Sequence, residues 1–151
     1  MPIDEIDRAL ATLLSHDARA PLKALAAGIG LSSPATSERV RRLEDNGIVR
    51  GYSADLDPAK LGFSIEALVR VRPLPGRNKR VEEALRDMPT VTECDKVTGE
   101  DCFVVRLFAR SIGDLDTLTE ALSRDATTNT SIVKKQVFRR RPPTASADPI
   151  S

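Results

Sequence analysis

Residues 21–52, PLKALAAGIGLSSPATSERVRRLEDNGIVRGY, decide how the rest of the chain is interpreted. Apolar residues recur every three or four positions from Leu22 to Ile29, which is the spacing of one face of an α-helix. Pro21 suits the first position of that helix, and Gly30 suits the residue that ends it. The stretch therefore opens with a short amphipathic helix.

A second helix is predicted directly after the first. Ser33 would be its N-cap, Pro34 would occupy its first helical position, and Asn46-Gly47 would end it. One face of this helix holds Thr36, Val40 and Leu43. Two short helices joined by about four residues, the second apolar on one side only, are typical of a helix-turn-helix that reads DNA. An ordinary helical hairpin would have the same pattern.

The residues around the second helix favour the DNA-binding interpretation. Residues 48–53 alternate apolar and polar as a wing strand would, so we predict a winged helix-turn-helix domain over residues 1–54. Small side chains in the first helical turn would approach bases, and Glu38 could accept a hydrogen bond from a cytosine amine. Arg39 would reach a base edge or a phosphate, and the later arginines would contact phosphates. The candidate DNA-binding residues are Ser32, Ser33, Ala35, Thr36, Glu38, Arg39, Arg41, Arg42 and Arg50.

The cationic signal in this chain is local. The 151 residues have a formal net charge of +1, and residues 1–60 hold eight Lys or Arg against nine Asp or Glu. A local patch is enough to hold phosphates, and such binding should fall steeply with salt. The expected partner is double-stranded DNA.

Other classes of function find little support in the sequence. The single histidine, His16, has no catalytic partners, and no metal-ligand spacing is present, so we expect no enzyme, no metal and no cofactor. No apolar stretch is long enough to span a membrane. Two cysteines without a disulfide pattern fit a reducing cytoplasm, where the protein would be associated with the nucleoid.

The second half of the chain predicts a different domain. After a linker over residues 55–62, the apolar period changes to two, which indicates a strand. Strands and helices then follow in the ferredoxin-like order β-α-β-β-α-β, so the predicted fold class is α+β. This domain would span residues 63–138, with strands over 63–72, 91–98, 102–109 and 131–138 and helices over 81–88 and 111–122.

One face of that sheet would lack a helical cover. Apolar side chains on an uncovered face usually mark an interface, and here they would be Leu68, Val104, Phe108, Ile132 and Phe138. We expect two sheets to pack face to face in a homodimer, whose two-fold symmetry would suit paired half-sites on DNA. Residues 139–151 are rich in Pro, Ser and Ala, which predicts a largely disordered tail.

Three stretches resemble the Lrp/AsnC (feast/famine) family of bacterial and archaeal regulators: IDEIDRALATLL, LAAGIGLSSPATSERVRRLEDNGIVRGYSADLDPAKLG and KVTGEDCFVVRLFARSIGDLD. The resemblance covers residues 3–138. It implies a transcriptional regulator whose homodimers often assemble further, into an octameric disc that is a tetramer of dimers. It also implies that a small amino acid or related metabolite binds between the ligand-sensing domains of neighbouring dimers.

The turn over residues 97–102 corresponds to the loop that lines the family's effector pocket. Backbone N–H groups at Gly99 can hold a carboxylate, and Glu100 or Asp101 can hold an ammonium group. A plain β-hairpin turn would also contain glycine and acidic residues. The candidate effector-binding residues are Thr98, Gly99, Glu100, Asp101, Thr127, Thr128 and Ser131.

Departures from the family pattern leave the operator and the effector open. Ser37 and Glu38 occupy the middle of the reading helix, where the family often has a bulky aliphatic or a basic residue. Asp101 and Cys102 stand where the family often has an aromatic residue or Asp. The chain could also be a DNA-silent ligand-binding partner of another regulator. Cys94 and Cys102 could approach each other as a redox switch, or they could be two half-buried thiols.

Overall fold

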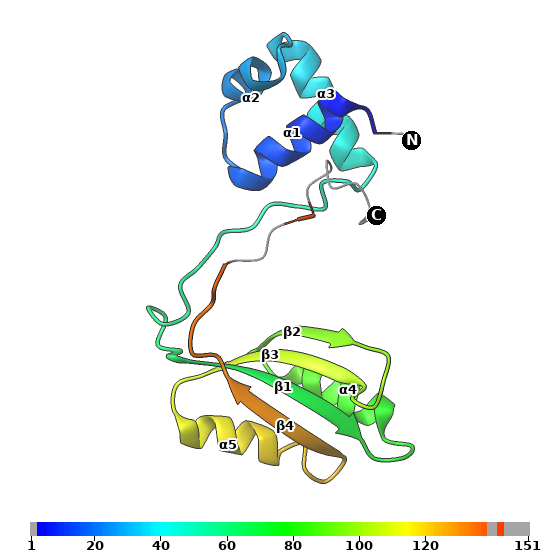
Figure 1. Cartoon of the computed structure of the whole chain (residues 1–151), viewed down its shortest axis with the longest axis vertical. Coiled ribbons are helices and arrows are strands. Elements are labelled where there is room, and N and C mark those ends of the chain that lie inside the picture. The colour runs from blue at the N-terminus through cyan, green and yellow to red at the C-terminus, as the bar shows by residue number, and fades with distance from the viewer. Residues whose placement is uncertain (1–2, 139–141, 144–151) are drawn as a thin grey trace. The chain divides into compact units, whose positions relative to one another are not determined.

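The computed structural model describes residues 3–138 and 142–143, and the chain divides into two compact units between Asp55 and Leu56 (Figure 1). Apart from residues 142 and 143, the predicted tail lies outside the described residues. No helix in these described residues is long and apolar enough to cross a membrane. The helices and strands are α1 (Glu5–His16), α2 (Leu22–Ile29), α3 (Ser33–Asp45), β1 (Ile65–Pro73), α4 (Asn78–Asp87), β2 (Val91–Lys96), β3 (Phe103–Ala109), α5 (Ile112–Glu120) and β4 (Ala126–Ile132).

The first unit is built from α1, α2 and α3, which pack around leucines. Leu10 of α1 and Leu43 of α3 are fully buried, and Leu25 of α2 packs in the same cluster. Asp4 caps α1, because its side chain accepts a hydrogen bond from the backbone N–H of Asp7 at 2.7 Å. The predicted pair of helices joined by a tight turn is confirmed.

The predicted starts of α2 and α3 are wrong by one residue. Pro21 is the N-cap of α2 and not its first helical residue, and Ser32 replaces Ser33 as the N-cap of α3. The Ser32 hydroxyl accepts a hydrogen bond from the backbone N–H three residues on, at 3.4 Å. Pro34 still fits the first turn, since the N–H groups of that turn have no helical partner and proline lacks one. Gly30 ends α2 with φ of 67°, as predicted.

The wing strand predicted over residues 48–53 is not formed in the described structure. The backbone N–H groups of Ile48 and Val49 both donate to the carbonyl oxygen of Leu43, at 2.9 and 3.1 Å. Both side chains also pack against the helical core. A strand needs a neighbouring strand to take its backbone hydrogen bonds, and here those bonds close the end of α3 instead.

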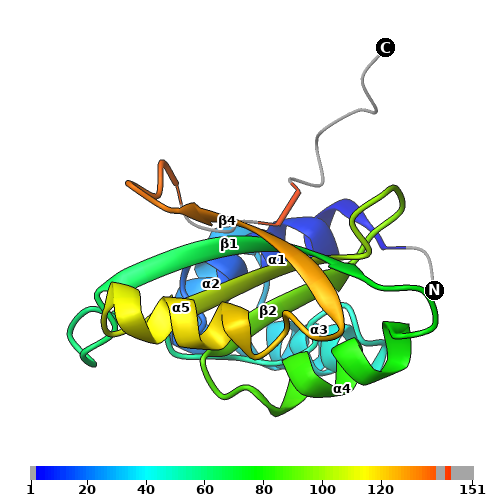
Figure 2. The ribbon, with the colours of Figure 1, turned by 90° about the horizontal axis from the view of Figure 1, so that it is seen from below.

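The second unit is a four-stranded antiparallel sheet in the order β2-β3-β1-β4. This order, with a helix after β1 and another after β3, confirms the predicted ferredoxin-like arrangement. α4 and α5 lie against the same face of the sheet (Figure 2). The core between them includes Val69 and Phe103 from the sheet and Leu85 from α4, each at most 1% exposed.

The last strand lies earlier in the chain than predicted, since β4 ends at Ile132 and does not continue over residues 133–138. β4 pairs with β1 in a register that sets Ile132 opposite Ala67. Ala67 is buried beneath the helices, so Ile132 belongs to the same side of the sheet and not to its open face. Phe138 lies beyond the strand. Neither residue is therefore part of the predicted open-face patch.

Candidate functional sites

The outer surface of α3 is the first candidate site. Ser37, Glu38 and Arg41 are exposed there, and helical spacing places them along one ridge. α2 adds the exposed Lys23 in its first turn, where the first helix of a helix-turn-helix crosses the DNA backbone. The sequence pattern missed Lys23, and its position near a helix start was the only available signal.

The other predicted DNA-binding residues differ in accessibility. Ser32 and Arg50 are exposed, whereas Ser33 and Ala35 are half-buried. Thr36 is fully buried, and its hydroxyl donates to the Ser32 carbonyl oxygen at 2.9 Å. This burial confirms that Thr36 lies on the face of α3 that holds Val40 and Leu43, and it contradicts the assignment of Thr36 to the DNA-reading surface.

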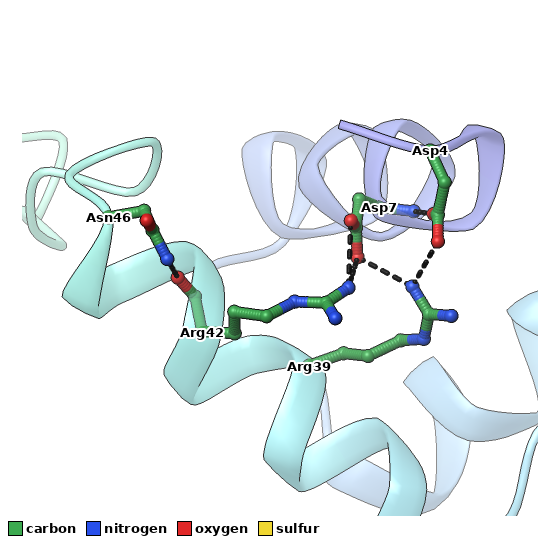
Figure 3. Close-up of polar contacts among 5 residues, drawn as sticks. All are labelled: Asp4, Asp7, Arg39, Arg42 and Asn46. Atoms are coloured by element: carbon green, nitrogen blue, oxygen red, sulfur yellow. Dashed lines mark hydrogen bonds and ion pairs between the residues drawn. The ribbon is translucent and has the colours of Figure 1, made fainter. Parts of the chain in front are cut away.

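Two arginines of α3 are bound to two acids at the start of α1 (Figure 3). Arg39 Nη1 donates to Asp4 Oδ2 at 2.7 Å and to Asp7 Oδ1 at 2.8 Å. Arg42 Nη2 donates to both carboxylate oxygens of Asp7, at 2.9 Å each. Asp7 is only 1% exposed, so its charge depends on these guanidinium groups. The two arginines that the sequence assigns to DNA thus have partners inside the unit.

Both acids of this cluster are ionised at neutral pH. Burial raises the pKa of Asp7, but the hydrogen bonds from Arg39 and Arg42 lower that pKa by more, and its value lies below that of ordinary aspartate. The hydrogen bond from Arg39 is the main reason that the pKa of Asp4 is lowered. Two carboxylates and two guanidinium groups make the cluster neutral as a whole.

Arg41 is the arginine of α3 that faces solvent. Its Nε lies 3.7 Å from Asp45 Oδ2, and the two side chains are 83% and 67% exposed. An ion pair this long and this exposed contributes little to the stability of the fold, so the Arg41 guanidinium group can bind a phosphate from solution.

The second candidate site lies at one end of the sheet. Arg72 of β1 binds both acids of the turn between β2 and β3: Nη2 donates to Glu100 Oε2 at 2.6 Å, and Nε lies 3.6 Å from Asp101 Oδ1. Thr127 of β4 is the register partner of Arg72, so it lies at the same end. Sequence reasoning missed Arg72, since a cation on the open face of a strand resembles an ordinary solvated residue. Its alternation with the buried Val71 was the available signal.

The remaining predicted effector residues do not all join this cluster. Thr98 and Gly99 belong to the same exposed turn, and Gly99 has φ of 114°, a conformation that favours glycine. Thr128 faces the opposite side of the sheet from Thr127, and Ser131 lies four residues further along β4. The structure therefore gathers the turn and Thr127, and it separates the other two.

The open face of the sheet carries apolar side chains and an ion cluster. Three residues predicted for this face are half-buried on it: Leu68, Val104 and Phe108. Between them, Arg106 of β3 binds Glu66 of β1 and also Glu93 of β2, the latter at 3.3 Å. The face is thus partly apolar and partly charged.

Cys94 and Cys102 are not positioned to pair. The register sets Cys94 opposite Val105, three residues along the chain from Cys102, which corresponds to about 10 Å in a strand. A disulfide requires Cα atoms roughly 4.4–6.8 Å apart. Cys94 instead lines a hollow of about 310 Å³ between α4 and β2, and burial raises the pKa of its thiol. This geometry contradicts the alternative in which the two thiols approach each other.

Comparison with known families matches both units. The AsnC-type helix-turn-helix domain matches residues 3–44, and the Lrp/AsnC ligand binding domain matches residues 66–143. The HTH-type transcriptional regulator LrpA of Mycobacterium tuberculosis is 36% identical over 129 residues, which cover 85% of this chain and 86% of that protein.

Solved structures agree with the fold. The structure of Bacillus subtilis LrpC has a TM-score of 0.87 at 26% identity, covering 93% of this chain and 100% of that chain. A feast or famine regulatory protein from M. tuberculosis, complexed with L-methionine, has a TM-score of 0.87 at 33% identity, with coverage of 95% and 99%. With both of its units matched in this way, the chain belongs to the Lrp/AsnC family of transcriptional regulators.

Proposed function

We propose that this regulator binds specific DNA sequences through the outer surface of α3 and changes its DNA affinity when a small amino acid binds to its sheet unit. One observation carries the DNA-binding part: α3 is fixed in the helical core on one side and presents Ser37, Glu38 and Arg41 on the other. A hydroxyl, a carboxylate and a guanidinium group can satisfy the donors and acceptors of base edges and phosphates. The activity belongs in the cytoplasm, where DNA and free amino acids are both available.

Fluorescence anisotropy with DNA from upstream of the protein's own gene tests DNA binding. A salt series should show tight, salt-sensitive binding that exceeds binding to a scrambled duplex. Arg41→Ala should weaken binding to every duplex and lower the salt slope by about one unit. Glu38→Gln should change the preference among operator variants with little effect on the slope. Binding that never exceeds the scrambled control would instead favour a DNA-silent partner of another regulator.

The cluster around Arg72 supports an amino-acid effector. A free amino acid carries a carboxylate and an ammonium group, and this end of the sheet offers a guanidinium group beside two carboxylates. Glu100 and Asp101 are 85% and 37% exposed, so both can reach a ligand from solvent. Because one solved relative is a complex with L-methionine, methionine is the first candidate to test.

Isothermal titration calorimetry against a panel of amino acids tests the effector site. Arg72→Ala should weaken the binding of the preferred amino acid at least about tenfold, because the carboxylate of the amino acid loses its charged partner. Arg124→Ala is the matched control, since Arg124 is an exposed arginine in the turn before β4. Equal affinities in the two variants would remove Arg72 from the site. If the effector acts on DNA binding, operator DNA must change the affinity for the amino acid by the same factor.

We also propose a homodimer formed by the open sheet faces, which assembles further into a tetramer of dimers. The support is the half-buried Leu68, Val104 and Phe108 on a face that neither α4 nor α5 covers. Light scattering over a concentration series should give a dimer or a larger even-numbered assembly. Phe108→Asp should shift the mass toward the monomer, and Leu74→Asp, in the loop after β1, should not. A monomer at all concentrations would contradict the proposal.

A further inference from the structure

We infer that Asp4 and Asp7 withhold Arg39 and Arg42 from DNA phosphates and thereby restrain indiscriminate DNA binding by α3. The inference rests on the proposed DNA-binding function and assigns a specificity role to two acids of a different helix. It also divides the four arginines of residues 39–50 into two that are bound to acids at the start of α1 and two exposed ones, Arg41 and Arg50.

Both guanidinium groups of the acid–arginine cluster are already bound to carboxylates. Arg42 binds both oxygens of one carboxylate, and Arg39 is held between two carboxylates at 2.7 and 2.8 Å (Figure 3). Charge-assisted hydrogen bonds of this length are among the stronger polar contacts in proteins. A DNA phosphate would therefore have to displace an existing carboxylate before it could bind either guanidinium group.

Burial of Asp7 keeps its guanidinium partners in place. The side chain is 1% exposed, so water cannot replace the guanidinium groups if they turn toward DNA. A buried carboxylate without a countercharge is strongly disfavoured. Arg42 is consequently fixed in place, and Arg39 is held both by this buried acid and by Asp4.

The exposed surface of α3 is left with one arginine among several acids. Once Arg39 and Arg42 are neutralised, the exposed Arg41 remains with the exposed acids Glu38, Glu44 and Asp45. Non-specific DNA affinity comes almost entirely from phosphate neutralisation. α3 therefore contributes only the phosphate contact of Arg41 to this affinity, and discrimination among sequences depends on base contacts.

Asp4→Asn is the decisive variant. Asparagine caps a helix about as well as aspartate, so α1 should stay folded. Arg39 loses one of its two acids, and it can then turn to a phosphate because Arg42 still binds both oxygens of Asp7 and keeps that buried carboxylate paired. The control is Glu5→Gln, which makes the same change in net charge one residue away, at an exposed position for which no ion pair is found among the described residues. Asp7→Asn would release both arginines, and its folding must be checked first.

Two measurements on the full chain decide the question. Asp4→Asn should bind a scrambled duplex with a salt slope steeper by about one unit, and at 0.1 M salt its affinity should rise about eightfold, while Glu5→Gln should change much less. Asp4→Asn should also elute from a heparin column at higher salt than Glu5→Gln, since heparin is a polyanion without an operator sequence. Equal behaviour of the two variants, or weaker binding by Asp4→Asn, would overturn the inference. If the wild-type chain shows no operator preference, the proposed function fails, and the heparin comparison still decides the inference.

Discussion

Replacing Asp7 by asparagine should lower the unfolding free energy of the helical unit by about 2–3 kcal/mol. Asp7 accepts three hydrogen bonds from Arg39 and Arg42, and its side chain is 1% exposed. Breaking a fully buried ion pair costs about 3–5 kcal/mol, because an uncompensated charge stays buried. The loss should be smaller here, since the side chains of Arg39 and Arg42 are 23% and 38% exposed and water can solvate them.

Tyr52 provides the assay. It is the only tyrosine, the chain has no tryptophan, and its hydroxyl donates to Glu44 Oε1 at 2.7 Å, so its fluorescence reports on the helical unit. For a unit of this size, the expected loss corresponds to a midpoint lower by roughly 10–20 °C. Glu5→Gln, on the exposed side of α1, should stay within about 0.5 kcal/mol of the wild type. An Asp7→Asn midpoint equal to that of the control would refute the reasoning.

The pH dependence gives the same prediction a second test. The pKa of Asp7 is lower in the folded unit than the ordinary aspartate value, so the unfolded chain binds more protons at acidic pH. The stability that the carboxylate provides is complete above its unfolded pKa and is lost as the pH falls through its lower folded pKa. In Asp7→Asn this acid-dependent loss should shrink, which a Tyr52-detected melting series from neutral pH downward would measure.

Three further outcomes follow from local geometry. Gly30→Ala should lower the unfolding free energy of the helical unit by about 1 kcal/mol, because Gly30 has a left-handed φ of 67°. Gly30→Asn should lower it less, since asparagine tolerates this conformation and no atom crowds the site. Urea unfolding followed by Tyr52 fluorescence measures both. Ser32→Ala should lower the unfolding free energy by about 1 kcal/mol because the N-cap of α3 is lost, whereas Ser33→Ala should leave it nearly unchanged. A larger loss for Ser33→Ala than for Ser32→Ala in the same urea experiment would contradict the assigned cap. Mild oxidation with diamide should form no internal disulfide between Cys94 and Cys102, which intact mass after alkylation would detect.

Local sequence signals predicted the helices well, but they misplaced β4 and predicted a strand after α3 that is not formed. Asp4, Gly30 and the recurring leucines mark helices through contacts within a few residues, and the structure confirms them. The position of β4 depends on its pairing with β1, and its polar sequence, ATTNTSI, has little apolar alternation to reveal it. The segment after α3 alternates as a strand does, but it has no partner strand in the described structure.

The candidate sites show the same limit. Exposure of Glu38 and Arg41 follows from helical periodicity, so the sequence could predict it. The capture of Arg42 by Asp7 joins residues 35 positions apart, and no local pattern encodes it. Arg72 likewise meets Glu100 only because β1 and the turn after β2 end at the same place in the sheet.

The two outer strands of the sheet differ in how well they resist self-association. Within the described residues, each leaves a row of backbone groups without a neighbouring strand, and such rows can recruit a strand from another molecule. β2 carries Glu93, Asp95 and Lys96, whose charges oppose the stacking of identical chains. β4 contains no charged residue and is rich in threonine, which favours extended backbone. In concentrated or partly unfolded samples, we expect aggregation to begin along β4, and a lysine placed on its exposed side should delay it.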